Sequence, residues 1–178
     1  MFCNQCQESA KNTGCTIKGV CGKEDDTANI QDLLIYLCQG LSYVTIAAKK
    51  EGISTNKESR NIAKSLFTTI TNANFDNDLI VKQIRNIIAV RNSLNARLAT
   101  PVQHASVQWN GKDLAEMESK ATEVGVLSFD ADEDIRSLKQ YVLYGLKGMA
   151  AYAEHAANLG KEQDDIYTFI EEALVAII

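Results

Sequence analysis

Hydrophobic residues recur along most of this chain at the spacing of a helix face. In the first such stretch they are separated by three or four positions: Ile30, Leu33, Leu34, Leu37, Leu41, Val44 and Ala48. Similar stripes predict further helices that begin near residues 55, 76, 113, 132 and 163. No stretch alternates over enough residues to predict a strand. The pattern therefore predicts an all-α protein.

Turn residues separate the predicted helices. Gly52 is a plausible stop for the first helix, and Pro101 ends the third, with residues 100–112 read as a loop. The first and fifth helices each contain a Gly-Leu pair, at Gly40 and Gly145, and each is followed by a polar turn and a shorter helix. Glycine destabilises a helix interior by about 1 kcal/mol relative to alanine, which indicates close backbone packing at these positions.

This weak internal repeat predicts two small bundles of the three-helix type. The predicted units are a Cys-rich segment at 1–27, a first helical bundle at 28–99 and a second at 100–178. A chance likeness between two leucine-rich helices is the alternative.

Composition excludes several classes of protein. The chain has 178 residues, of which 46% are hydrophobic and 23% charged, so it can form a core without disulfides. We expect no membrane span, because no window approaches about 20 uncharged apolar residues. The formal net charge of -5 and the lack of a basic block argue against nucleic acid as a partner. The N-terminus lacks the features of a secretory signal, so we expect a cytoplasmic protein.

Four of the five cysteines lie within the first 21 residues: Cys3, Cys6, Cys15 and Cys21. Their spacing is C-x2-C-x8-C-x5-C, and nearby glycines allow the backbone to turn tightly around a centre. In a reducing compartment such thiols stay free or bind metal. The segment is predicted to be a cofactor-binding loop.

Several occupants are compatible with these four thiols. An iron–sulfur cluster suits their uneven spacing, whereas structural zinc sites usually show two close pairs. Two disulfides, a redox-active dithiol and an accidental arrangement are further alternatives. Lysines at 11, 18 and 23 would favour the reduced state of a cluster, or they belong to a solvated loop. Cys38, His104 and His155 are interpreted as ordinary packing residues.

The N-terminal segment resembles a known family. The stretches MFCNQCQE at 1–8 and GCTIKGVCGK at 14–23 are closely similar to the start of the hybrid cluster proteins, also called prismane proteins. The stretches TANIQDLL at 27–34, YGLKG at 144–148 and AYA at 151–153 also resemble that family. The resemblance covers nearly all of the chain, and the cysteine block is its most specific part.

The resemblance implies a cofactor and a function. It implies that Cys3, Cys6, Cys15 and Cys21 hold a 4Fe–4S cluster near the surface, since family members with wider spacing carry a 2Fe–2S centre. It also implies an N-terminal domain made of two crossed helical bundles. The complete protein would be a hydroxylamine reductase that forms ammonia, with nitric oxide reduction as a further proposed activity.

This chain departs from the family in length. Family members are several times longer, and two downstream domains hold their active centre, a hybrid iron–sulfur–oxygen cluster, through histidine, glutamate and cysteine. The single further cysteine and two histidines here cannot supply that ligand set. We therefore expect a truncated N-terminal domain, inactive alone, that passes electrons from a redox donor to the downstream domains. Self-association through surface that those domains would cover is also expected.

A structural zinc-binding helical interaction module without a redox role is the alternative function. A further alternative is an interaction domain whose cysteines only pack.

Overall fold

The computed structural model describes residues 1–178 and contains helices but no strand. The helices are α1 (Asp25–Lys50), α2 (Asn56–Thr68), α3 (Asn77–Asn95), α4 (Ala105–Gln108), α5 (Leu114–Glu123), α6 (Glu133–Asn158) and α7 (Asp164–Ala176), with two short 3-10 helices, η1 (Ala10–Asn12) and η2 (Val126–Ser128). The all-α prediction is confirmed, and each long helix begins close to its predicted position. Only α4 lies where the sequence predicted a continuous loop.

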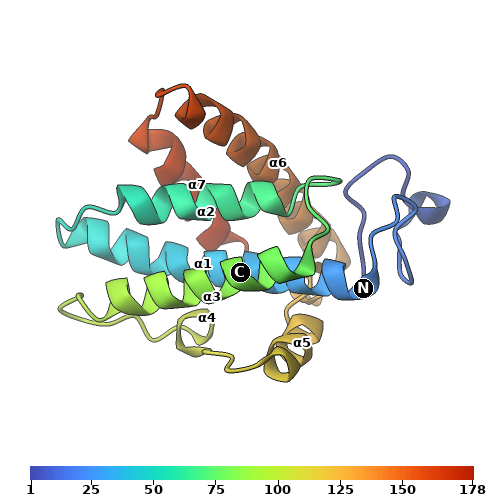
Figure 1. The fold of residues 1–178 in the computed structure, drawn as a ribbon, viewed down its shortest axis with the longest axis horizontal. Helices are drawn as coiled ribbons and strands as arrows, with labels where there is room; N and C mark the ends of the chain where they lie inside the picture. Colours follow the sequence, from blue (N-terminus) through green and yellow to red (C-terminus); the bar gives the residue numbers. More distant parts are fainter.

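Helix α1 is the axis of the fold (Figure 1), and α2, α3, α4, α5 and α7 pack against it. It is buried because its leucines and other apolar residues point to several sides, as in Leu33, Leu34 and Leu37. Helix α6 packs on α2 and α7. A single cluster of 27 buried residues includes side chains from both predicted bundles. The boundary at residues 99 and 100 stays a prediction.

Helix α1 is also long and apolar enough to cross a membrane by length and composition alone. Of its most hydrophobic window, 78% is buried inside the structure. A central core helix passes the same test, so the hydrophobicity of α1 is accounted for by the packing around it.

The mid-helix glycines differ in what surrounds them. A Cβ on Gly40 would lie 2.3 Å from the backbone oxygen of Ser106, so α4 packs directly on the backbone of α1. A Cβ on Gly145 or Gly148 would meet nothing within 4 Å. The prediction of close backbone packing is therefore confirmed for Gly40 and is wrong for Gly145 within this chain. Gly52, with φ of 74°, follows the end of α1 as predicted.

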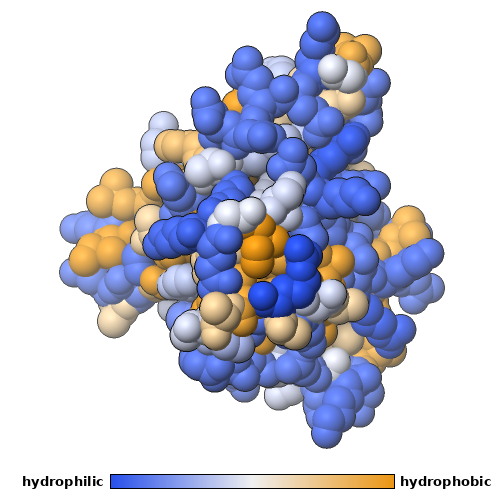
Figure 2. Space-filling view, turned by 90° about the vertical axis from the view of Figure 1, so that its left-hand side faces the viewer, coloured by the Kyte–Doolittle hydropathy of each residue, from blue (hydrophilic) through white to orange (hydrophobic).

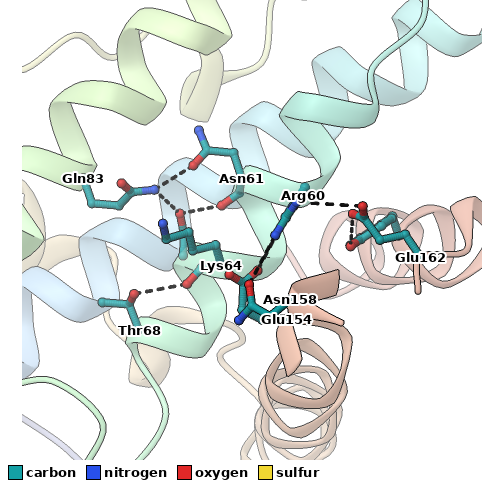
Figure 3. A network of polar contacts seen from close by, with 10 residues as sticks. Arg60, Asn61, Lys64, Thr68, Gln83, Glu154, Asn158 and Glu162 are labelled. Carbon is teal, nitrogen blue, oxygen red and sulfur yellow. Dashed lines mark hydrogen bonds and ion pairs between the residues drawn. The ribbon is translucent and has the colours of Figure 1, made fainter. Parts of the chain in front are cut away.

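A polar network joins α2 to α3 and α6 (Figure 3). The Arg60 guanidinium lies 3.8 Å from carboxylate oxygens of both Glu154 and Glu162. From α3, the side-chain amide of Gln83 donates a 2.8 Å hydrogen bond to Asn61. Arg60 remains partly exposed, so these contacts position the helices more than they stabilise them.

The N-terminal segment lies beyond the start of α1 (Figure 1). The opposite end of the molecule is mostly hydrophilic, with small separate hydrophobic areas (Figure 2). The cysteine segment is thus placed at one end of the helical body.

Candidate functional site

Cys3 and Cys15 lie side by side in the N-terminal segment. The Cys3 amide donates to the Cys15 carbonyl at 3.0 Å, and the Cys15 amide donates to the Cys3 carbonyl at 2.8 Å. They form an isolated antiparallel bridge, in which paired residues have Cα atoms about 5.5 Å apart. The fold therefore brings together two predicted ligands that are distant in sequence.

Tight turns carry the other two cysteines. The Cys6 carbonyl accepts hydrogen bonds from the backbone and the hydroxyl of Ser9. Cys21 lies in a turn closed by a 2.8 Å hydrogen bond from the Gly22 amide to the Gly19 carbonyl. A Cβ on Gly19 would lie 3.1 Å from the Cys21 sulfur, so a glycine lets this thiol approach the backbone. The predicted role of glycine in shaping the segment is confirmed at this position.

All four cysteines are free thiols in the structure. Four such thiols on one segment are the donor set of an iron–sulfur centre, so the residue types fit that group. The structure shows only part of the arrangement that a metal site needs. No three His, Cys, Asp or Glu side chains in residues 1–178 gather in a way that could hold a metal ion. The bridge joins only Cys3 to Cys15, and the full ligand set stays a prediction.

Two lysines are buried near this site, one in the segment and one on α6. Lys147 of α6 is 1% exposed, and its ammonium donates a 3.2 Å hydrogen bond to the Thr69 carbonyl. Lys23 is 2% exposed, donates a 2.7 Å hydrogen bond to Gln31 and lies over the ring of Phe75. Buried lysine without a paired charge is rare, so the surroundings of both ammonium groups matter.

Asp32 of α1 is a carboxylate that interacts electrostatically with both lysines. It lines a cavity of about 30 Å³ together with Cys3 and Lys147. Burial raises the pKa of Asp32 to about 6, although Lys147, Lys23 and the N-terminal amine oppose this rise. Burial lowers the pKa of Lys147 to about 8, and Asp32 partly restores it. Asp32 is half-buried, and it also lines a second, more open pocket beside this cavity.

Sequence reasoning missed Lys147 and Asp32. The available signal was a lysine within an apolar stripe, since Lys147 follows Leu143 by four residues and precedes Ala150 by three. Of the three lysines that the sequence singled out, only Lys23 is buried. Lys18 pairs with Glu24 at the surface, and Lys11 is exposed.

The remaining candidate residues pack as expected. Cys38 is fully buried, and burial raises the pKa of its thiol to about 12. The His104 ring stacks on Tyr43 with centroids 4.4 Å apart, and its Nδ1 lies 2.7 Å from the Ser106 hydroxyl. His155 meets the ring of Phe67 edge to face.

Comparison with known proteins shows a relationship over the whole chain. The sequence profile described as "Prismane/CO dehydrogenase family" matches residues 1–178. A hydroxylamine reductase of Acetivibrio thermocellus is 46% identical over 178 residues, which is 100% of this chain and 33% of the relative. Hydroxylamine reductases of Desulfitobacterium hafniense and Bacteroides fragilis are 47% and 48% identical, each over 99% of this chain. The match covers 33% and 32% of those two relatives, so the chain spans about a third of their length.

Proposed function

This chain belongs to the Prismane/CO dehydrogenase family, and on that premise we propose that it is the electron-transfer region of a hydroxylamine reductase. The observation that carries the proposal is its identity of 46–48% to hydroxylamine reductases over essentially all of its residues. The four free thiols on one segment at one end of the helical body are consistent with it.

In the proposed site, Cys3, Cys6, Cys15 and Cys21 hold a 4Fe–4S cluster, which supplies one-electron chemistry. Four thiolate ligands would leave no iron position open to a substrate, which favours electron relay over substrate binding. The Cys3–Cys15 bridge holds two of these proposed ligands next to each other. The remaining two, Cys6 and Cys21, are on hydrogen-bonded turns.

Backbone amides near Cys21 would tune the potential by donating to sulfur. The sequence indicated the amides from Gly19 to Lys23. The Gly19 amide donates to the Lys23 carbonyl and the Gly22 amide to the Gly19 carbonyl, so these two are already used. The amides of Val20, Cys21 and Lys23 make no backbone hydrogen bond and are the remaining donors.

The partners follow from the length of the relatives. The other two thirds of a full-length protein would hold the hybrid iron–sulfur–oxygen cluster, reduce hydroxylamine to ammonia and possess any nitric oxide reductase activity. This chain would accept an electron from a cytoplasmic redox donor and pass it to that region. Alone, it is proposed to be inactive toward hydroxylamine.

Anaerobic metal analysis tests the proposal. Protein purified without oxygen should be brown, contain about four irons and four sulfides per chain, and give a paramagnetic signal on reduction. Cys15→Ser should lower the iron content to less than half, because one ligand is lost. Cys38→Ala is the matched control, since this buried thiol lies outside the segment, and it should retain all iron. A colourless anaerobic protein with one zinc per chain would instead establish the zinc-binding module.

A further inference from the structure

We infer that Lys147, with Asp32 as its counter-charge, is a positioning residue that sets the reduction potential of the centre held by the cysteine segment. This inference rests on the proposed function, because it needs a redox centre at Cys3. It assigns the electrostatic role to a residue of α6, far along the chain from the cysteines.

Contacts between the segment and the helices place Lys147 near Cys3. The Asn4 side chain donates a 3.0 Å hydrogen bond to Gln140 of α6, which fixes the residue after Cys3 on that helix. Two turns further along α6, Lys147 lines the small cavity that it shares with Cys3 and Asp32. The ammonium group is therefore on the inner side of the segment, away from bulk water.

The charges around this cavity are unbalanced. Three cationic groups act on Asp32: Lys147 from α6, Lys23 from the segment and the N-terminal amine. Asp32 is the one carboxylate among the groups that act on Lys147. The floor beneath Cys3 thus carries more positive than negative charge.

A buried cation acts strongly on a nearby redox centre. Reduction adds one negative charge, and an ammonium group in a low-dielectric surrounding stabilises that charge more than one in water does. Lys18 is at the surface and paired with Glu24, so solvent and salt screen it. The favourable effect on the reduced state, which the sequence assigned to loop lysines, therefore belongs more to the buried lysines, Lys147 and Lys23, than to Lys18.

The test compares reduction potentials of the anaerobic, iron-loaded chain. It is done in an Asp32→Asn background, because Asp32 would otherwise take up a proton when the lysine is removed and mask the effect. Asp32→Asn should raise the potential above that of the wild type. Adding Lys147→Met should lower the ratio of reduced to oxidised centre about tenfold relative to Asp32→Asn, or about 59 mV for one electron. Lys18→Met in the same background is the matched control and should change the ratio less than twofold.

Conservative substitution and salt provide independent measurements. Lys147→Arg in the same background keeps the charge and should change the ratio of reduced to oxidised centre less than twofold. A loss of packing alone would not predict this result. In the wild type, the ratio of reduced to oxidised centre at a fixed potential should change less than twofold between about 0.05 and 1 M salt, because salt does not screen the buried charge. A tenfold change of that ratio with salt in the wild type would overturn the inference even if no variant takes up iron.

The two proposals fail in different ways. A wild-type chain that takes up no iron and sulfide overturns the proposed function and this inference together. An iron-loaded chain whose potential is unchanged by Lys147→Met overturns only the inference.

Discussion

Arg91 offers a sharp test of how the loop after α3 is held. This arginine is fully buried and has no carboxylate partner. Its guanidinium donates hydrogen bonds of 2.7 Å to the carbonyls of Ser106 and Trp109 and one of 2.8 Å to the Asn110 side chain. Arg91→Met keeps most of the side-chain volume but leaves these acceptors without their donor. We expect the variant to be destabilised.

The magnitude follows from two opposing effects. Hydrogen bonds to a charged group contribute about 1.5–3 kcal/mol each, so three of them contribute about 5–9 kcal/mol. Burial lowers the pKa of Arg91 from 12.5 to about 10. A fall of that size means that burying the charged guanidinium lowers the stability of the wild type by at most about 3 kcal/mol. The uncharged methionine does not have this cost, so the variant regains that stability. We therefore expect the free energy of unfolding to fall by about 2–6 kcal/mol.

Urea denaturation at pH 7, followed by circular dichroism, measures this change. Trp109 is the one tryptophan of the chain, and it is half-buried in the loop that Arg91 holds. Its emission should therefore shift to longer wavelength in the variant before global unfolding. Arg97→Met is the matched control, because Arg97 is exposed and near the same helix end, and it should change stability by less than about 0.5 kcal/mol. An Arg91→Met protein within about 1 kcal/mol of wild type, with unchanged emission, would refute the reasoning.

Three further outcomes follow from the structure. Gly40→Ala should destabilise the chain in thermal melts, because its Cβ would lie 2.3 Å from a backbone oxygen of α4, whereas Gly145→Ala should be neutral or stabilising by about 1 kcal/mol. Asp32→Asn should remove a pH dependence of stability, measured by urea titrations. Burial raises the pKa of Asp32 from 3.8 to about 6. The stability that protonated Asp32 contributes, up to about 3 kcal/mol, is therefore present below about pH 4 and lost as pH rises through 6. A parallel pH profile in the two proteins would contradict this. Leu138 and Tyr141 of α6 are 66% and 77% exposed, so light scattering should show self-association of the separate chain that Leu138→Lys weakens, and a monomer at all concentrations would argue against it.

The long helices were predictable because their apolar residues recur every three or four positions. The apolar positions of α1 and of α3 are spaced so that only a helix brings them to one core, and local turn residues such as Gly52 mark where they end. Helix α4 was missed for a physical reason. Its four residues are too few to show a period, and contacts distant in sequence, from Arg91 and Gly40, hold it in place.

The candidate site was predictable only in its residue types. Spacing identified four clustered thiols, but it does not say which of them face each other, and the Cys3–Cys15 bridge depends on the path of the intervening loop. The burial of Lys147 was equally hidden, since a lysine in an amphipathic helix usually reaches solvent. Its partner Asp32 is 115 positions away in sequence, and only the tertiary fold brings the two to one cavity.

Arg91 and Lys147 are two of the three buried cationic side chains of this fold, and they differ in how completely they are satisfied. That difference separates structure from proposed function. Carbonyl and amide oxygens of α3, α4 and the residues after α4 surround the guanidinium of Arg91, so their dipoles largely offset its charge. The ammonium of Lys147 makes one hydrogen bond, to Thr69, and shares a single carboxylate with other cations. Its charge is therefore less compensated, and Lys147 lines the same small cavity as Cys3. Since an incompletely paired buried charge lowers stability, a chain that needed only a stable bundle would be better served by an apolar residue at position 147.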